Sequence, residues 1–528
     1  MSEGRSPSIV RRMPPSHATD RWTGARHGLP TAYRGADLVV LGVGVMIGAG
    51  IFGLAGRQAA SMAGPGVILS FMIAGITSLL VAFCFAELSS AMPTSGSAYT
   101  FAYVIFGEVW AWIVGWALVL ELLLAAAVVA RAWSHYAAQL LTDLGVDLPQ
   151  VVASVVGQST GFDLFTLFIL AVLTAVVALG ARVGLRTLWI IVVAKLVAIG
   201  AVIVVGALHF DRRNLAAIPV PATPPGKAGD TLHSPLLGIL FGQTGTFGWF
   251  GIFAASAAIT FAYIGFDVVA TAAEEAEDAP RSIPKGIIRG LMFTTVIYIA
   301  VAVVMVGMIP YDRIDASAPL ASAFRDAGEG FMVHVINVGA VLGLTTVVLV
   351  LLVGLTRVMF SMARDGLIPR PLSKINRGYR SPTRVTLLIG FLAILLAEFV
   401  DVLTLEPLVV IGALFVFIVV AGGVVRMRQT MPDLPRGFRT PFSPGVPIAS
   451  ILACLWLMVN LQLITWLYFT IWMAFGVLVY LVYGRRNSVL ATMARPVPEA
   501  PAPVYYQGPP PGGPGAGSAA GPRGRHRR

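Results

Sequence analysis

The stretch Gly42–Gly56 reads GVGVMIGAGIFGLAG and decides the fold. It holds six glycines in fifteen residues and no charge, inside an apolar run long enough to cross a bilayer. Each interior glycine costs a helix roughly 1 kcal/mol relative to alanine, so a plain anchor helix gains nothing from it. Non-helical backbone at membrane depth is tolerated where protein buries it or a water-filled cavity meets it. We therefore expect a helix break at Gly48-Ala49-Gly50, with free N–H groups that face a ligand. The alternative is a small-residue packing face through Gly44, Gly48 and Gly56.

The composition is that of a polytopic, all-α membrane protein. The chain has 528 residues, of which 57% are hydrophobic and 12% charged, whereas soluble domains carry about a quarter charged residues. Twelve apolar runs approach the ~20 residues that a bilayer core requires. They fall at 37–57, 66–90, 108–137, 164–181, 187–208, 250–272, 287–309, 331–356, 383–402, 406–425, 447–464 and 466–483.

The loops and tails predict the orientation and the domain boundaries. One set of alternate loops holds sixteen lysines and arginines and the other set seven, so the positive-inside rule places the first set in the cytoplasm. We expect a basic cytoplasmic tail at 1–35, a twelve-helix transporter domain at 36–484, and a disordered cytoplasmic tail at 485–528. The last of these is rich in Pro, Gly and Arg, which cannot build a core.

A second glycine interrupts the sixth apolar run. Ile259–Asp267 reads ITFAYIGFD, with Gly265 in the middle of the run and a carboxylate two residues later. Glycine-interrupted spans at matching places in two halves are the best sequence pointer to a transporter binding site. The match between runs 1 and 6 predicts a five-helix unit used twice, with two helices appended.

Several motifs together resemble the amino acid–polyamine–organocation superfamily, and its cationic amino acid transporter branch in particular. They are Ile47–Phe52, Pro93–Tyr99, Phe261–Asp267, Glu274-Glu275, Arg281–Ile287, Ala363–Gly366, Phe438–Pro441 and Tyr483–Arg486. The resemblance spans about 35–487. It implies the inverted 5+5 fold with broken helices 1 and 6, and an amino-acid permease that resides in the plasma membrane.

Two ionisable residues lie deep in apolar runs. An ionisable side chain inside a membrane is by default a functional hypothesis. Lys195 stands among Val, Ile, Ala and Leu, and burial strips its amine of hydration, which favours the neutral form. The resemblance implies that this lysine carries a coupling proton, with Glu121 as its polar partner. A fixed structural counter-ion is the alternative for Lys195, and a hydrogen-bonded buried acid is the alternative for Glu121.

Four further acids are candidates for an inner gate. Glu87 lies near the expected cytoplasmic end of the second run, and Asp267, Glu274 and Glu275 follow the second break, opposite the arginines of the inner loops. A purely structural role is an equal alternative for all four.

The ligand pocket follows from the physics of helix ends. The N-terminal end of a half-helix offers N–H groups to a carboxylate, and the C-terminal end offers carbonyls to an ammonium. One unwound stretch can thus bind both ends of a zwitterionic amino acid. The resemblance places the carboxylate at the amides beside Gly48, namely Ala49 and Gly50. It places the amine at carbonyls near Met46, Ile47, Phe261, Ala262 and Ile264, with Phe261 able to close over the pocket.

Other function classes fit less well. Seven scattered histidines and two distant cysteines predict no metal, no cofactor and no enzyme. The basic residues lie in short loops and tails, which membrane orientation explains without nucleic acid. We expect protons, the bilayer and an amino acid as partners. The function expected is proton-coupled secondary transport, with uncoupled exchange or a non-transporting sensor as alternatives.

Overall fold

The computed structural model describes residues 11–14, 33–48, 50–146, 149–158, 160–180, 185–215, 232–241, 246–315, 319–376, 378–379 and 381–493. Within these ranges the chain is helical, and its β-structure is limited to isolated bridges. The all-α prediction is therefore confirmed. The helices that matter below are α2 (Gly35–Met46), η1 (Gly50–Leu54), α3 (Ala55–Gln58), α4 (Val67–Ala91), α5 (Ala98–Ile105), α6 (Glu108–Asp143), α8 (Leu164–Ala178), α9 (Leu185–Leu208), α11 (Gly248–Tyr263), α12 (Val268–Thr271), η5 (Ala272–Glu275), α13 (Ala279–Met308), α15 (Gly330–Arg364), α16 (Thr383–Phe399), α17 (Val402–Thr430), α18 (Gly445–Val459), α19 (Leu463–Val479) and η8 (Tyr480–Gly484).

The described helices agree with a polytopic membrane protein. Eight segments of the described residues are long and apolar enough to cross a membrane, and the first, Gly35–Ala91, contains two of the expected runs. The other expected runs coincide with the shorter helices α8, α16 and α18. The number of twelve spans and the inverted repeat stay predictions.

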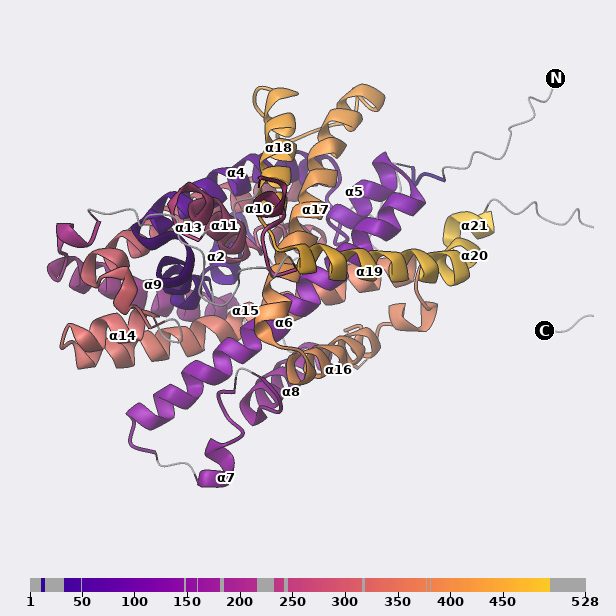
Figure 1. Ribbon diagram of the computed structural model, residues 1–528. Coiled ribbons are helices and arrows are strands. Elements are labelled where there is room, and N and C mark those ends of the chain that lie inside the picture. The colour runs from indigo at the N-terminus through magenta and orange to yellow at the C-terminus, as the bar shows by residue number, and fades with distance from the viewer. Residues whose placement is uncertain are drawn as a thin grey trace, which may run out of the picture.

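Two groups of helices pack around the breaks. In one group α13 packs along α2 and α4, and α11 packs on α4; in the other, α6 packs along α15, and α16 packs on α8. α6 crosses the middle of the molecule (Figure 1). Its centre is buried on every side and apolar except for Glu121, as expected of a helix without a solvent-facing stripe. The broken helix α2 contacts α15, and α17 contacts both α4 and α6, so the two groups meet along these helices.

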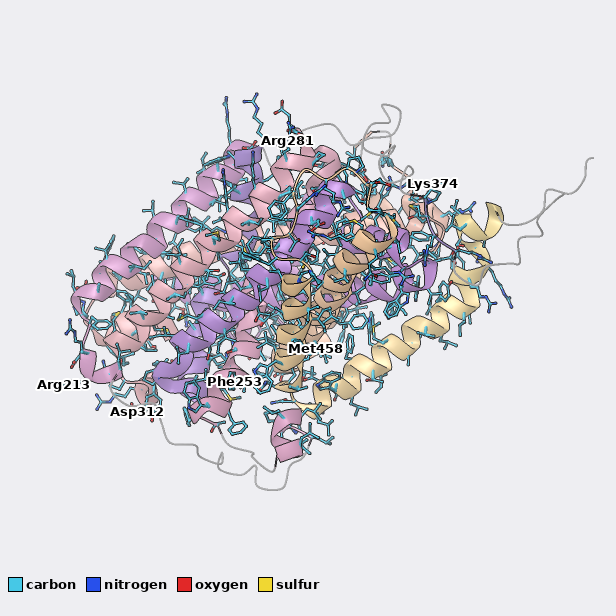
Figure 2. All side chains as sticks on the ribbon, turned by 90° about the horizontal axis from the view of Figure 1, so that it is seen from above. Arg213, Phe253, Arg281, Asp312, Lys374 and Met458 are labelled. Carbon is cyan, nitrogen blue, oxygen red and sulfur yellow. The ribbon has the colours of Figure 1, made fainter. Side chains whose placement is uncertain are left out.

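The polar ends of the molecule define two faces. Arg281 and Lys374 lie along the upper edge of Figure 2, whereas Arg213 and Asp312 lie at its lower left. We name these the Lys374 face and the Asp312 face. The loops that we expect inside and outside the cell are thus represented on opposite faces.

The chain continues in helical form beyond residue 484, where we expect the transporter domain to end, and the domain boundaries stay predictions. The chain forms two further short helices, α20 (Arg485–Asn487) and α21 (Val489–Met493). Ser488 between them is buried, and its hydroxyl donates to Glu108 Oε2 over 2.8 Å. This contact anchors a segment whose composition alone predicts disorder. Residues 494–528, and most of 1–35, lie outside the described residues.

Candidate functional site

Both glycine-interrupted helices are broken where the sequence predicts. α2 ends at Met46, Ile47 is extended (φ −73°, ψ 94°), and the chain resumes helical form at Gly50 as a π-helical turn. α11 ends at Tyr263, and Ile264 is extended (ψ 136°). Gly265 then adopts φ 118°, which side chains with a Cβ rarely tolerate. Ala49, one of the expected ligand-binding residues, lies outside the described residues.

The two breaks lie against each other. A Cβ added at Gly50 would lie 2.2 Å from Ala262 Cβ and 2.5 Å from Ala262 Cα. A Cβ added at Gly265 would lie 2.3 Å from Val45 Cγ1. Glycine at these two positions therefore permits the close approach of one unwound backbone to the other.

Three glycines of the first stretch also serve packing. A Cβ added at Gly44 would lie 3.1 Å from the Val192 side chain. One added at Gly48 would lie 2.6 Å from Val347, and one added at Gly56 would lie 1.9 Å from Pro319. The two interpretations of the stretch are thus compatible, because the glycines both break the helix and let α9, α15 and residue 319 approach it.

Lys195 of α9 closes the broken end of α2. Its side chain is fully buried, and its Nζ donates to the carbonyls of Gly44 (2.6 Å) and Ile47 (3.0 Å) and to Thr346 Oγ1 (3.2 Å). The last carbonyls of a helix lack intrahelical partners, and a cation interacts favourably with that end of the dipole. Lys195 therefore caps the break itself.

The expected contact between Lys195 and Glu121 is not formed. Glu121 is buried in α6 beside Gly412 of α17, and neither of its carboxylate oxygens has a hydrogen-bond partner among the described residues. The lysine amine already has three acceptors, two carbonyls at the end of α2 and the Thr346 hydroxyl of α15. Lys195 and Glu121 are thus two separate buried ionisable groups, and not a pair.

Tyr298 of α13 bridges the two breaks, and the sequence analysis missed it. Its hydroxyl contacts the carbonyl oxygens of Met46 and Ala262, the second over 3.0 Å. A phenol has one proton, so it donates to one of these carbonyls at a time. A tyrosine in the middle of an apolar span requires a polar partner, and this requirement was the available signal.

A small cavity lies where the breaks meet. Its volume is about 20 Å³, which is room for roughly one water molecule. It is lined by Val45, Met46, Gly50, Ala125, Val129, Phe261, Ala262, Ile264, Val347 and Leu351. Met46, Gly50, Phe261, Ala262 and Ile264 are expected site residues, whereas Ile47 and Gly48 lie beside the break without lining the cavity.

The remaining walls of the cavity come from two unbroken helices. Ala125 and Val129 belong to α6, and Val347 and Leu351 belong to α15. Sequence reasoning had no signal for them, because they are ordinary apolar residues in long apolar helices. Every described side chain that lines this cavity is apolar.

Two of the expected gating acids meet arginines of α15. Glu274 accepts hydrogen bonds from the Ser95 amide (3.0 Å) and hydroxyl (2.8 Å) and lies 3.6 Å from the Arg364 guanidinium. Glu275 lies 2.5 Å from the buried Arg357 guanidinium. The chain just after the second break is thus tied to α15 by two ion pairs at its C-terminal end.

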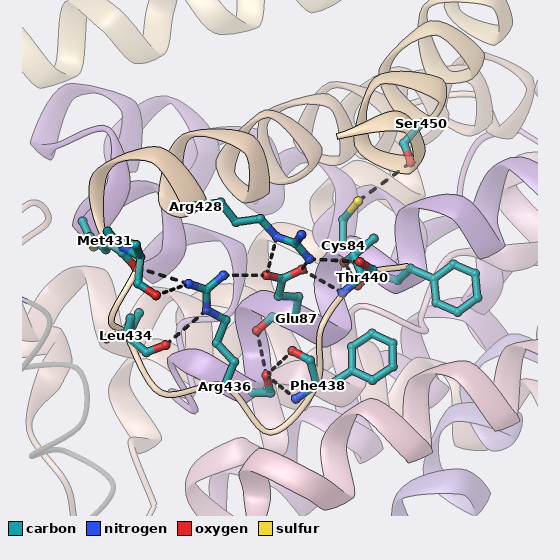
Figure 3. Close-up of polar contacts among 12 residues, drawn as sticks. Cys84, Glu87, Arg428, Met431, Leu434, Arg436, Phe438, Thr440 and Ser450 are labelled. Carbon is teal, nitrogen blue, oxygen red and sulfur yellow. Dashed lines mark hydrogen bonds and ion pairs between the residues drawn. The ribbon is translucent and has the colours of Figure 1, made fainter. Parts of the chain in front are cut away.

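Glu87 lies at the centre of a buried cluster (Figure 3). Arg428 of α17 donates to both of its carboxylate oxygens, at 2.9 and 2.7 Å. Arg436 donates to Oε1 over 3.1 Å, and the Thr440 amide donates to Oε2 over 2.8 Å. Two of these four bonds tie the end of α4 to α17, and the other two tie it to the connection between α17 and α18.

Asp267, which we expect to face the loop arginines, makes no ion pair with an arginine of the described residues. Its Oδ1 accepts a hydrogen bond from the Gly265 amide over 3.1 Å. The reason is local: α11 has ended, so the amide of Gly265 has no helical acceptor and the nearby carboxylate supplies one. Asp267 therefore caps the second break from within.

An ion pair near the Asp312 face was not predicted. Arg57 Nη1, just after the glycine-rich stretch, donates to Glu406 Oε2 of α17 over 2.8 Å. The half-helix that follows the first break is thus held to α17. Ion pairs thus join helices near both faces of the molecule.

Comparison with known proteins identifies the family. The model of the family described as "Amino acid permease" matches residues 36–492. The methylthioribose transporter of Bacillus subtilis is 38% identical over 86% of this chain and 93% of its own length. The branched-chain amino acid permease BcaP of the same organism gives the same values. Cationic amino acid transporter 2, vacuolar, of Arabidopsis thaliana is 36% identical over 81% of this chain and 65% of its own length. The chain therefore belongs to the amino acid permeases of the amino acid–polyamine–organocation superfamily.

Proposed function

We propose that this protein is a secondary active transporter that carries a neutral L-amino acid with an apolar side chain by alternating access. The observation that supports it is the pair of helix breaks that meet at one apolar cavity. A binding site for a zwitterion needs opposite partial charges a few ångströms apart, and the ends of two half-helices supply them.

Backbone groups hold the two charged ends of the substrate in this proposal. The substrate carboxylate meets the N-terminal end of η1 at Ala49 and Gly50. Its ammonium meets the carbonyls of Met46, Ala262 and Ile264. Each carbonyl oxygen has two lone pairs, so the contacts that Tyr298 makes with Met46 and Ala262 leave an acceptor site on each.

The cavity lining favours a neutral side chain. A lysine or arginine substrate would bury a charge that needs an acceptor, and the described lining residues offer no carboxylate. Methylthioribose, which names one relative, carries neither the carboxylate nor the ammonium that the helix ends complement. At about 20 Å³ the cavity must widen to admit an amino acid, so substrate entry requires α6 and α15 to separate from the breaks.

Lys195 is the proposed carrier of the coupling proton. Its amine bonds two carbonyls of the broken helix, so its protonation and the geometry of the break depend on one another. By thermodynamic linkage, protonation of Lys195 then changes the affinity for substrate, and bound substrate changes the proton affinity of Lys195 by the same factor. We place the protein in the plasma membrane with the Lys374 face and both termini in the cytoplasm. Glu87, Glu274 and Glu275 then belong to the inner closure, and Glu121 is a second candidate for proton binding.

Uptake into proteoliposomes tests the proposal. We expect labelled leucine to accumulate when the lumen is alkaline, and excess unlabelled leucine, but not arginine or methylthioribose, to compete. Accumulation of arginine instead would reject the substrate class. Exchange without accumulation on a pH gradient would establish an uncoupled exchanger, and binding without flux would establish a sensor.

A further inference from the structure

A second and larger cavity lies at the opposite end of α6 from the Asp312 face. Its volume is about 800 Å³, within the range of ligand-binding cavities. It lies among the start of α6, the end of α17, the junction of α19 with η8, and residues 11–12. None of its lining residues belongs to the cavity between the helix breaks.

The polar part of the lining is strongly basic. Four arginines line the cavity against a single glutamate. That glutamate, Glu108, is already engaged by the Tyr480 hydroxyl (3.0 Å), the Ser488 hydroxyl (2.8 Å) and Arg11 (3.8 Å). The lining therefore carries an excess of positive charge with no acid left to neutralise it among the described residues.

The remaining three arginines are available to a ligand. The side chains of Arg12 and Arg485 are exposed and make no hydrogen bond or ion pair within the described part of the chain. Arg426 lies over the ring of Phe106, 5.9 Å from its centroid. Its Nε is buried and lacks an acceptor in the same residues. An anionic oxygen in the cavity would supply the partner that this guanidinium lacks.

The other part of the lining is apolar and faces outward. Trp110 at the start of α6 is 44% exposed, and Leu481 in η8 is 49% exposed. Both lie at the ends of membrane-spanning segments, where tryptophan characteristically sits at the level of lipid headgroups. Basic and apolar surfaces thus adjoin at the boundary between the membrane and the aqueous phase.

We propose that this cavity binds an anionic phospholipid. Its phosphate lies against Arg426, Arg12 and Arg485, and its acyl chains follow the apolar surface of Trp110 and Leu481. A free phosphate would use the arginines alone and leave the exposed apolar side chains uncovered. The lipid matches both parts of the lining, and basic pockets between spans bind such headgroups by these interactions.

Native mass spectrometry of the purified full-length protein tests this proposal. Delipidated protein is titrated with phosphatidylglycerol or phosphatidylcholine of identical acyl chains, and inorganic phosphate is added as a competitor. We expect the first bound phosphatidylglycerol to be retained at least tenfold better than phosphatidylcholine. Arg12→Gln and Arg426→Gln should each weaken it about fivefold, as expected for one cation near a membrane surface. Arg289→Gln, which removes an exposed arginine of α13 outside the cavity, should leave it unchanged.

Three outcomes would overturn the proposal. Equal retention of both lipids would remove the headgroup specificity, and equal loss in Arg289→Gln would show only a general effect of charge. Displacement of the lipid by millimolar inorganic phosphate would identify a phosphate site in place of a lipid site. Arg12 is exposed, so Arg12→Gln leaves the fold intact even if Arg426→Gln does not. None of these readouts depends on transport.

Discussion

Gly50→Ala is the sharpest test of the meeting between the two breaks. The added Cβ would lie 2.2 Å from Ala262 Cβ and 2.5 Å from Ala262 Cα, whereas carbon atoms pack at ~3.5–4.0 Å. One of the clashing atoms is backbone, so no rotamer change relieves it and the half-helices must separate. Overpacking of this kind destabilises the packed conformation by about 1–3 kcal/mol. This exceeds the roughly 0.4–1 kcal/mol by which Gly→Ala stabilises a protein through lower conformational entropy of the unfolded chain.

The expected result is a loss of substrate affinity of roughly 5- to 100-fold, at about 1.4 kcal/mol per factor of ten. Thermal stabilisation by leucine measures it, because a ligand that binds the native state raises the melting temperature with concentration. Gly53→Ala is the matched control on the same turn, since its added Cβ would meet only the Arg57 guanidinium, at 3.9 Å. Wild-type affinity in Gly50→Ala, or an equal loss in Gly53→Ala, would refute the reasoning.

Four further outcomes are expected. Lys195→Ala should still exchange leucine but fail to accumulate it on a pH gradient. Its melting temperature should also fall, because two buried carbonyls lose their donor and each unsatisfied carbonyl lowers the free energy of unfolding by about 1–3 kcal/mol. Wild-type accumulation in this variant would mean that the lysine is only structural. Tyr298→Phe should lower leucine affinity without loss of expression, measured by the same thermal shift, because one hydroxyl contacts both breaks. Glu87→Gln should destabilise the protein by about 3–5 kcal/mol, since it leaves two arginines without a buried anion; a chemical-denaturation midpoint equal to wild type would contradict this. In whole cells an impermeant maleimide should label Arg213→Cys but not Lys374→Cys, and the reverse pattern would overturn the proposed orientation.

Local composition was sufficient to predict both helix breaks. Glycine density in an uncharged span indicates the first, and Gly265 followed by Asp267 indicates the second, because backbone conformation is set within a few residues. The same local argument did not identify the hydrogen-bond partner of Asp267. A carboxylate two residues from an unpaired amide binds that amide, and sequence distance to the loop arginines gave no information about this competition.

Contacts between helices that are distant in the chain could not be predicted from the sequence. Lys195 is recognisable as a buried cation, but its acceptors, the carbonyls of Gly44 and Ile47, are set by how α9 crosses α2. Glu121 is recognisable as a buried acid, but the same crossing gives the lysine other acceptors. Likewise, nothing in the apolar sequence of α15 distinguishes Val347, which lines the cavity, from the residues that face other helices.

The main-chain character of the break has a consequence for engineering and for divergence within the family. Amides and carbonyls are the same whatever side chain a residue carries, so the polar anchor that we propose at Gly50 and Ala262 depends on close backbone approach and not on side-chain chemistry. In the proposed site, selectivity would reside in separate cavity-lining positions such as Ala125, Val129 and Leu351. A designer can therefore redirect the cargo by altering the shape of α6 and α15 while leaving the anchor untouched. On this proposal, one framework could serve relatives named for branched-chain and for cationic amino acids.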